Sequence, residues 1–406
     1  MLAHINQYNA LIYLNYALDK IVRCKQNLYM DQKTLVATIP CVLMRAGTSR
    51  GPFFLQEWLP SNIAARNRIL VAAIGSMDST QINGLGGGTS LTSKVAIVSP
   101  STRPDCEVDY LFAQLSVTDQ TVDTKPNCGN MLAGVAPFAI EQGLVHIQGE
   151  TTTVKVHNVN TGARIDVSVR TPNGNVQYSG SDKDVKIDGV NEPATPVLLT
   201  FTDAWGAIDA TESEREATIF PTGKRKEVID GIECTCLVAG QTMVLMRASD
   251  IAREFPNAKI QGNEPAAVLD AIPGLIERLE KIRRIAAERM GLGDVSSSVI
   301  PKPVLISSGA APTEIISRYF TPKKCHTSHA VTGAIGIATA LAMRGTVASN
   351  HEPLIGEQEI RVLHPSGVIQ IAAHIAPADA THPEPFLTRA SVVRTVRKIM
   401  QGNFYL

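Results

Sequence analysis

The sequence predicts an α+β protein made of two pseudo-symmetric lobes, each a barrel-like, mostly antiparallel sheet around a central helix. Three observations support this fold class. The same series of strand and helix patterns occurs twice, about 200 residues apart, short segments of alternating apolar and polar residues end at turn glycines, and each half contains one helix that lacks a polar face. With 406 residues, the chain is also long enough for two cores.

We divide the sequence into an N-terminal extension over residues 1–37, a first lobe over 38–197 and a second lobe over 198–406, whose final segment could pack back on the first lobe. The extension contains a moderately apolar stretch from Leu11 to Val22, which predicts a helix. Basic residues follow this stretch, which reverses the order found in a secretory signal. We assign the extension no role.

The first repeated element is a glycine turn followed by an apolar strand and a polar helix start. It begins at Gly47 in the first half and at Gly240 in the second. The second repeated element is a strand that opens with a lysine. Lys94 leads into Val-Ala-Ile-Val, and Lys302 leads into Pro-Val-Leu-Ile. Residues of this kind favour strands, so a strand is predicted after each lysine.

The third repeated element is a helix of small apolar residues, over 128–142 in the first half and 328–344 in the second. Neither helix has the polar face of a surface helix, so each is predicted to lie inside its lobe. The fourth element is a hairpin with its turn glycine at Gly162 or Gly367. Because four elements keep their order and spacing, we interpret the chain as an internal duplication with a ligand cleft between the lobes.

Two segments fall outside the repeat. Residues 264–290 are rich in Glu, Arg and Lys, and they predict a pair of surface helices. Residues 389–401 predict a closing amphipathic helix. Neither segment carries an obvious catalytic motif, so we expect both to serve the fold.

Composition excludes several kinds of partner. The 38 basic and 38 acidic residues balance, so we expect no binding to nucleic acid or to an anionic membrane. No run of about 20 apolar residues is present that could span a membrane. The 7 cysteines are odd in number and lack a CxxC pair, which predicts a cytoplasmic protein with most thiols packed as small core residues. The sequence leaves a homodimer open.

The segment Lys125-Pro-Asn-Cys128-Gly-Asn places a cysteine at the start of the first buried helix. Pro126 favours an extended chain before the helix, and Asn127 is the expected N-cap. The free amides and the positive dipole end of a helix start favour thiolate and anions, so Cys128 is a candidate proton donor or acceptor. The alternative is a buried structural thiol, but the polar neighbours Asn127 and Asn130 favour a functional one.

A glycine-rich loop precedes Lys94. Its curled backbone is expected to turn N–H groups toward a carboxylate, with hydroxyl groups beside them. The candidate residues of this loop are Gly87, Gly88, Thr89 and Ser90. The loop is not a P-loop, because Val95 follows the lysine where that motif requires Ser or Thr. In a desolvated cleft, Lys94 could have a lowered pKa and act as a base; the alternative is an ordinary solvated lysine at a strand end.

A turn in the first lobe carries Arg45 and Arg50 on either side of Thr48 and Ser49. Two arginines around hydroxyl groups suit bidentate capture of a carboxylate by Arg45, Thr48 and Ser49. An exposed turn with ordinary surface arginines fits the same pattern. The motif is therefore a candidate for substrate binding that needs support from elsewhere in the chain.

Polar residues also precede the second central helix. They are Cys325, His326, Thr327 and Ser328. A helix start with such donors could hold another carboxylate, and we expect His326, Thr327 and Ser328 to contribute. No further ligands follow at usable spacing, so no metal site is predicted. Ser366, in the turn His364-Pro-Ser-Gly, is either a ligand contact or simply part of a hairpin.

In combination these motifs resemble those of the PrpF-type isomerases, a group that includes methylaconitate cis–trans isomerase, 4-oxalomesaconate tautomerase and methylitaconate Δ-isomerase. The likeness spans residues 38 to 401. The motifs that carry it are Ile39-Pro-Cys-Val-Leu-Met-Arg45-Ala-Gly-Thr-Ser, Gly87-Gly-Thr-Ser-Leu-Thr-Ser-Lys94, Asp109-Tyr-Leu-Phe-Ala-Gln114, Asn127-Cys-Gly-Asn130, Gly134-Val-Ala-Pro-Phe-Ala-Ile and His364-Pro-Ser-Gly.

The resemblance implies the two-lobed diaminopimelate-epimerase-like fold and chemistry without a metal or organic cofactor. It assigns Lys94 and Cys128 as catalytic residues. It also places several residues on the first-lobe side of the site: Ser49, Thr89, Ser90, Asn127, Gly129 and Asn130. The family motif commonly has Gly where this chain has Ala46, and Lys where it has Arg50, a difference that concerns substrate fit. Cys325 lies ahead of the second helix and does not match Cys128, so a Lys–Cys pair suits an allylic shift better than a two-thiol epimerisation.

The resemblance therefore implies a cofactor-independent isomerase or tautomerase that acts on a small unsaturated di- or tricarboxylate. One group removes a proton and the other returns a proton to the far allylic carbon, and the sequence leaves open which of the two is the base. The motifs look nearest to the 4-oxalomesaconate tautomerase branch. Isomerisation of 2-methylaconitate or aconitate is the alternative reaction. A non-catalytic accessory protein that binds a polycarboxylate or an aconitase-like enzyme is a third hypothesis.

Overall fold

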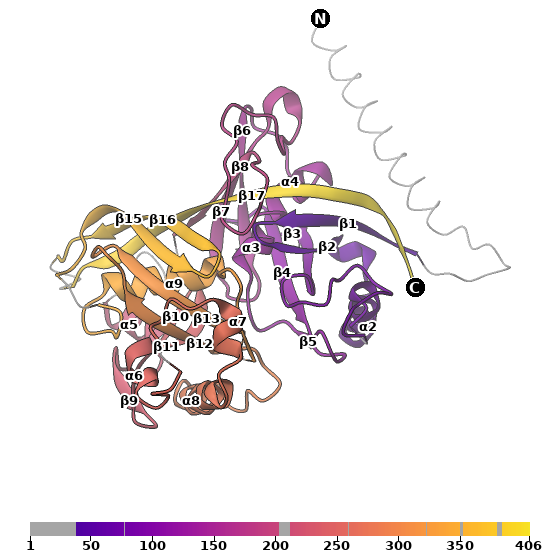
Figure 1. Cartoon of the computed structure of the whole chain (residues 1–406). Helices are drawn as coiled ribbons and strands as arrows, with labels where there is room; N and C mark the ends of the chain where they lie inside the picture. The colour runs from indigo at the N-terminus through magenta and orange to yellow at the C-terminus, as the bar shows by residue number, and fades with distance from the viewer. Residues whose placement is uncertain are drawn as a thin grey trace, which may run out of the picture. The chain divides into compact units, whose positions relative to one another are not determined.

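The computed structural model of the chain (Figure 1) describes residues 38–76, 78–202, 212–258, 260–321, 323–349, 352–379 and 384–406. Within them, Pro40–Phe404 form one compact unit. The expected extension over 1–37, with its helix from Leu11 to Val22, lies outside the described residues.

In the first half of the chain, the described residues form eight strands. They are β1 (Thr38–Ala46), β2 (Ser49–Leu55), β3 (Lys94–Pro100), β4 (Val108–Leu115), β5 (Val122–Asp123), β6 (Thr151–Asn158), β7 (Arg164–Arg170) and β8 (Pro196–Phe201). The pairs β1–β2, β3–β4, β6–β7 and β7–β8 are antiparallel, whereas β2–β3 and β4–β6 are parallel. Along β6 every second residue is buried, as expected of a strand that covers a core with one face.

The second half repeats this topology after a short strand, β9 (Glu227–Ile229). Its strands are β10 (Ile232–Ala239), β11 (Gln241–Arg247), β12 (Lys302–Ser308), β13 (Glu314–Thr321), β14 (Lys324–Cys325), β15 (Gly356–His364), β16 (Gly367–Ala376) and β17 (Phe386–Tyr405). As in the first half, β11–β12 and β13–β15 are parallel, while β10–β11, β12–β13 and β15–β16 are antiparallel. The predicted duplication and the predicted fold class are confirmed.

Strand β17 connects the two halves. It pairs with β16 through Phe386–Ser391 and with β8 through Ala390–Thr395, and it also pairs with β1. The strands β1, β2, β3, β4, β6, β7, β8 and β17 thereby close into a ring (Figure 1). The helix expected over 389–401 is therefore wrong. This segment is rich in Val, Thr and Ile, and the pairing available along both edges outweighs its amphipathic spacing.

The boundary expected between residues 197 and 198 falls inside β8, whose residues Leu198–Phe201 pair with β7. The division of the chain at that point stays a prediction. The final strand nevertheless reaches β8 and β1, which belong to the first half, so the two halves share a sheet edge.

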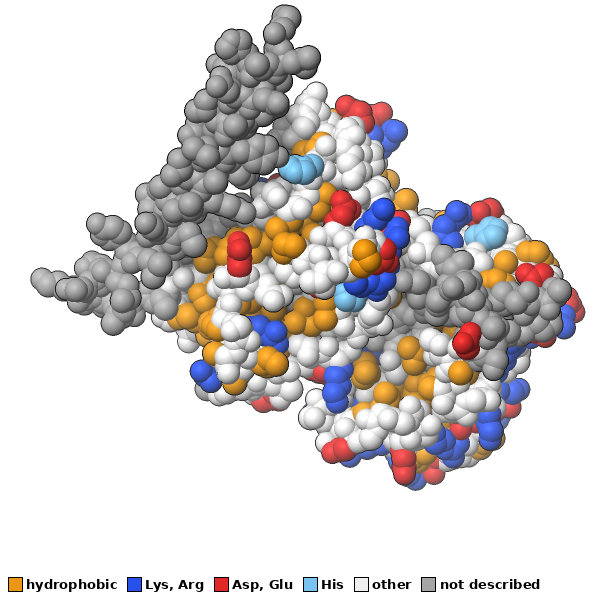
Figure 2. All heavy atoms as spheres, turned by 180° about the vertical axis from the view of Figure 1, so that it is seen from behind, with side chains coloured by type: hydrophobic (Ala, Val, Ile, Leu, Met, Phe, Trp, Pro, Cys, Tyr) orange, Lys and Arg blue, Asp and Glu red, His pale blue; other side chains and the backbone are white. Residues whose placement is uncertain are grey.

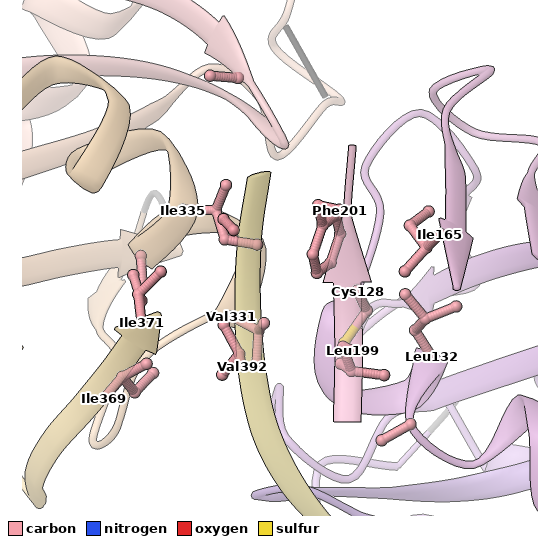
Figure 3. Close-up of a cluster of buried hydrophobic side chains, with 14 of the residues drawn as sticks. Cys128, Leu132, Ile165, Leu199, Phe201, Val331, Ile335, Ile369, Ile371 and Val392 are labelled. Carbon is pink, nitrogen blue, oxygen red and sulfur yellow. The ribbon is translucent and has the colours of Figure 1, made fainter. Parts of the chain in front are cut away.

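Buried helices lie against the inner faces of the strands. The first is broken into α3 (Gly129–Leu132) and α4 (Val135–Glu141), where one helix over 128–142 was expected. Pro137 explains the break, because its ring prevents a helical bond to the carbonyl of Ala133, four residues earlier. The second is α9 (Val331–Ala342), all twelve residues of which are buried, and it is shorter at both ends than the predicted 328–344. Figure 3 shows Val331 and Ile335 of α9 in the same apolar cluster as Leu132 of α3.

The remaining helices lie outside the repeat. They are α2 (Ile63–Ile74), α5 (Glu212–Ile219), α6 (Ala248–Ala252), α7 (Ala266–Asp270) and α8 (Leu275–Arg289), with 3₁₀ turns at Gln56–Trp58 and Pro172–Gly174. The pair α7 and α8 confirms the surface helices predicted over 264–290. α8 buries Leu275, Leu279 and Ile282 in a second apolar cluster that includes Leu305 of β12. Arginines and glutamates cover the other face of α8.

None of the described helices is long and apolar enough to cross a membrane. On the face shown in Figure 2, basic and acidic side chains are interspersed, as the balanced composition predicts.

Candidate functional site

Lys94 is the first residue of β3 and is only 8% exposed. Its Nζ donates a hydrogen bond of 2.7 Å to Oε1 of Gln114, the residue opposite it on β4. The ring centroid of Phe112 lies 5.2 Å from the same nitrogen. Burial lowers the pKa of Lys94, and the Cys128 charge opposes this change. The lysine is thus a buried amine rather than a solvated strand end, and its environment favours the neutral form that can accept a proton.

Gln114 also connects Lys94 to the glycine-rich loop, because its Nε2 donates to the backbone carbonyl groups of Ser90 and Ser93 at 3.3 and 2.9 Å. The side chain of Gln81 occupies the middle of this loop. Its Oε1 accepts hydrogen bonds of 2.9 Å from the N–H groups of both Gly87 and Gly88. These two N–H groups were expected to face a carboxylate, but in the structure they donate to Gln81, and a role of Gly87 and Gly88 in substrate binding stays a prediction. The loop positions the partner of Lys94.

The hydroxyl groups of the loop are partnered in the same way. Thr89 Oγ1 and Thr92 Oγ1 lie 2.9 Å apart, and Ser93 Oγ donates to the backbone carbonyl of Thr89 at 2.7 Å. Thr89 is exposed, whereas Ser90 is half-buried. Among the residues predicted from this loop, Ser90 therefore has the most direct contact with the Lys94 environment, through Gln114.

Cys128 is the N-cap of α3, a position that was expected for Asn127. The residue is 7% exposed, and the hydroxyl of Tyr110 donates to its backbone carbonyl at 3.1 Å. Its side chain packs in the apolar cluster with Leu132 and Leu199 (Figure 3). Because α3 has a single turn, a helix dipole contributes less here than the sequence suggested. Cys128 is related to Lys94 through charge: a negative charge on Cys128 raises the pKa of Lys94.

A second buried lysine is present that the motif analysis did not assign to the site. Lys302 opens β12, which is the strand that the repeat matches to the one led by Lys94, and it is 6% exposed. Burial, together with the Lys94 charge, lowers the pKa of Lys302 to about 7. Arg283 acts in the same direction, and Asp123 and Cys128 oppose it. The repeat itself was the signal that could have identified this residue, since Lys302 follows from Lys94 by the internal duplication.

Arg45 has a structural role that the sequence did not predict. Its NH1 nitrogen donates to the backbone carbonyl of Thr395 at 2.6 Å, to the hydroxyl of the same residue at 3.0 Å and to the carbonyl of Gly47 at 3.1 Å. Arg45 thereby fastens β1 and its turn to β17. The carboxylate capture expected of this arginine stays a prediction, with its NH1 nitrogen already used by these protein acceptors.

The turn after Arg45 reaches the second half of the chain through Asn130. The Oδ1 of Asn130 accepts from the N–H of Thr48 at 3.4 Å, and its Nδ2 donates to Thr48 Oγ1 at 3.1 Å and to the backbone carbonyl of His329 at 3.4 Å. A Cβ added to Gly129 would lie 2.8 Å from Cβ of Val331. The starts of α3 and α9 therefore meet, and they bring Thr48 and Asn130 to the segment that precedes α9.

That segment holds the residues predicted from the second half. His326 Nδ1 accepts from the N–H of Ser328 at 3.0 Å, and burial together with the Lys94 charge keeps the pKa of His326 well below its usual value. The histidine is thus neutral and close to the lysine. Ser366 Oγ donates to the backbone carbonyl of Thr327, which joins the β15–β16 turn to the same segment. His326, Thr327, Ser328 and Ser366 are therefore brought together.

Several buried polar atoms in this region have no hydrogen-bond partner among the described residues. Such atoms are uncommon inside proteins, because an unpartnered buried polar group costs about 1–3 kcal/mol. They belong to Ser49, Asn127, Thr332, His364 and Arg394. A polar ligand with several acceptor and donor atoms would satisfy them.

The site therefore combines two buried amines, a thiol and neutral histidines, a set of groups that can hold an anion and move protons. No group of three or more His, Cys, Asp or Glu side chains that could hold a metal ion occurs among the described residues. The expectation of chemistry without a metal or cofactor remains a prediction.

The chain is similar in sequence to several known proteins. Residues 36–406 match the family model described as PrpF protein. YbhH of Escherichia coli, an isomerase by provisional name, is 46% identical over 368 residues, which are 91% of this chain and 99% of that protein. The 4-oxalomesaconate tautomerase of Pseudomonas putida is 40% identical over 366 residues, which are 90% of this chain and 95% of that protein. The 2-methyl-aconitate isomerase of Cupriavidus necator is 34% identical over 394 aligned residues, and the match covers 90% of this chain and 96% of that protein.

Solved structures support the fold. A methylitaconate-delta-isomerase superposes with a TM-score of 0.67 at 30% identity, over 92% of this chain and 96% of that one. A probable proline racemase from Agrobacterium radiobacter superposes with a TM-score of 0.51 at 12% identity, over 90% of this chain and 92% of that one. The second similarity concerns the fold alone.

Proposed function

The chain belongs to the PrpF family and is an isomerase, and we propose that it moves a proton and a double bond through a 1,3-allylic shift in an unsaturated tricarboxylate. The favoured substrate is 4-oxalomesaconate, because the relative of that name is 40% identical over nearly the whole chain. The observation that carries the proposal is the buried amine of Lys94, which is held by Gln114 and whose pKa is lowered by burial, together with a buried thiol, Cys128, at the start of α3.

In the proposed reaction the neutral amine of Lys94 takes a proton from the carbon next to a carbonyl or conjugated acid. The electrons of that C–H bond form the new double bond of a dienolate, and buried N–H and O–H donors stabilise its charge. The thiol of Cys128 then gives its proton to the far allylic carbon, and the thiolate regains a proton that originates from the Lys94 ammonium. Each partner in such a transfer contributes about 10²–10⁴-fold to the rate.

Lys302 is a second buried amine near Lys94, since the Lys94 charge is one of the causes, after burial, that lower the pKa of Lys302 to about 7. Two buried lysines repel each other when both are protonated, so their proximity favours a state in which one amine is free to act as a base.

Lys94→Met and Cys128→Ser test the assignment. Each variant is expected to fold and to lose deuterium incorporation into the substrate in D₂O by about 10²-fold or more, as followed by ¹H NMR. Lys155→Met and Cys106→Ser are matched controls, since they change an exposed lysine of β6 and another buried cysteine. Near-full turnover in either Lys94→Met or Cys128→Ser would contradict the proposed pair.

Isomerisation of 2-methylaconitate or aconitate is the second candidate, and the 34% identical 2-methyl-aconitate isomerase supports it. A panel of unsaturated tricarboxylates in the same NMR assay separates the two reactions, because only the true substrate acquires deuterium at catalytic rates. The non-catalytic accessory hypothesis is not retained, because the relatives in this comparison are named as isomerases.

A further inference from the structure

Arg394 on β17 is a buried guanidinium without an acidic partner. It is 5% exposed, its NH1 donates at 2.8 Å to the backbone carbonyl of the preceding Val393, and its Nε has no partner. Within the described part of the chain no Asp or Glu forms an ion pair with it. Burial lowers the pKa of Arg394 to about 10, which still leaves it charged at neutral pH. An uncompensated buried charge destabilises the folded state, and an anion bound beside Arg394 would offset that cost.

His364, at the end of β15, supplies a second unused donor. Its Nδ1 accepts a hydrogen bond of 3.2 Å from the N–H of Ser366, so the proton of the neutral ring sits on Nε2. This Nε2 is buried and has no partner. The neighbouring His329 differs, since its Nδ1 contacts the carbonyl of Ala330 and its Nε2 contacts Ser317 Oγ, both at 2.8 Å. The missing acceptor is thus a property of His364 and not of buried histidines in this region.

The two donors face the same part of the interior. Successive side chains of a strand alternate between its faces, so Arg394 shares the buried face of β17 with Val392 and Val396. Val392 belongs to the same apolar cluster as Val331, the first residue of α9 (Figure 3). Arg394 lies two residues further along β17. The Arg394 charge is one of the causes, after burial, that lower the pKa of His364 to about 4.

Several contacts connect this pair to the segment that contains Cys128. The rings of His329 and His364 have centroids 6.2 Å apart, and the backbone carbonyl of His329 accepts from Asn130, two residues after Cys128. On the other side, the N–H of Gly47 donates at 2.9 Å to the carbonyl of Thr395, the neighbour of Arg394. The first route joins the start of α3 to His364 on β15, and the second joins Gly47, which lies against the side chain of Asn130, to β17.

We propose that Arg394 and His364 together bind one carboxylate group of the substrate, a carboxylate that the proton shift leaves unchanged. This inference rests on the proposed function, which supplies a polycarboxylate. A guanidinium and an imidazole N–H donate charge-assisted hydrogen bonds of the kind that carboxylates accept best. The bound carboxylate supplies the countercharge that Arg394 lacks in the protein. It also satisfies Nε of Arg394 and Nε2 of His364.

The test measures binding rather than turnover. Propane-1,2,3-tricarboxylate has no double bond to move, and its affinity for the full chain is measured by calorimetric titration. Arg394→Met is expected to weaken binding by about 10- to 100-fold, which corresponds to the loss of one charged hydrogen-bonding group. His364→Phe is expected to weaken it by about tenfold. His364→Gln, whose amide N–H can take the place of Nε2–H, is expected to recover part of the loss.

Thermal unfolding separates ligand binding from a structural role. Arg283 is the matched control, because it is 1% exposed but donates to Glu280 and to the carbonyl groups of Val295, Ser298 and Ile300. Arg283→Met is expected to lower the Tm of the free chain. Arg394→Met is expected to leave that Tm unchanged or higher, and to abolish the Tm increase that the tricarboxylate causes in the unmodified chain.

Three results would overturn the subsite: unaltered affinity in Arg394→Met, a Tm loss as large as that of Arg283→Met, or no binding of the tricarboxylate by the unmodified chain. The proposed proton transfer is judged separately by deuterium exchange in Lys94→Met and Cys128→Ser. A failure of either proposal can therefore be recognised without the other.

Discussion

Replacing Lys302 with methionine is expected to stabilise the folded chain below pH 7 and to change how its stability depends on pH. In the unfolded chain the amine keeps its proton up to a pKa of 10.5, whereas in the folded chain the pKa is about 7. Between these values the unfolded state binds more protons than the folded state. The contribution of Lys302 is therefore unfavourable and complete below pH 7, and it fades as the pH rises toward 10.5.

The magnitude follows from the interval between the two pKa values. At 1.36 kcal/mol per pH unit, the interval from about 7 to 10.5 corresponds to a destabilisation of about 5 kcal/mol at low pH. Methionine has a similar length and no charge, so Lys302→Met removes this cost and keeps most of the packing. The variant should gain up to about 5 kcal/mol at pH 6 and almost nothing near pH 10.5.

Urea unfolding at pH 6, 7, 8 and 9 measures the difference in unfolding free energy between Lys302→Met and the unmodified chain. That difference should fall by about 1.4 kcal/mol for each pH unit above 7. Lys155→Met, which changes an exposed lysine of β6, should show no such trend. Parallel pH profiles for Lys302→Met and the unmodified chain would refute the reasoning, because they would mean that Lys302 carries the same charge in both states.

One substitution and one binding experiment test the surroundings of Lys94. A Cβ at residue 51 would lie 1.9 Å from the backbone carbonyl oxygen of Lys94, so Gly51→Ala should separate β2 from β3. Urea unfolding should show an unfolding free energy lower by more than about 2 kcal/mol, and unaltered stability would disprove this packing. Binding of propane-1,2,3-tricarboxylate at pH 8 should take up protons, because its negative charge opposes the burial that lowers the pKa values of Lys94 and Lys302. Titrations in buffers of different ionisation enthalpy measure this uptake, and identical heats in all buffers would contradict it.

Much of the fold follows from local sequence patterns. The strands around Lys94 and Lys302 and the two hairpins were predictable because strand alternation and turn glycines act over a few residues. Strand β17 was not, because its apolar spacing fits a helix as well as a strand. What decides is pairing with β8 and β16, which lie far away in the sequence. The break at Pro137 could have been predicted, since a proline inside a helix removes one bond and blocks another.

The residues of the candidate site also differ in how far they could be predicted from the sequence. Lys94 and Cys128 stand in motifs that can be recognised one residue at a time, and both are buried in the structure. The contacts of Gly87 and Gly88 could not be predicted, because their N–H groups donate to the side chain of Gln81, which lies six to seven residues earlier in the chain. No sequence pattern identified Arg394, because it was part of a segment predicted to be a closing amphipathic helix, and only the pairing of β17 in the sheet places it in the interior.

The duplication also explains why the proposed chemistry is not symmetric. Each half supplies a buried lysine at the start of the equivalent strand, Lys94 and Lys302, but only the first central helix begins at a thiol. The corresponding N-cap of α9 is Ala330, and Cys325 lies earlier, on β14. Two matched thiols would suit inversion at one carbon, where a proton leaves one face and returns to the other. Groups of different acidity suit a shift between two unlike carbons, because donor and acceptor are matched to different atoms. Placing a cysteine at Ala330 should therefore not restore the activity of Cys128→Ser, since the new thiol would face the wrong carbon.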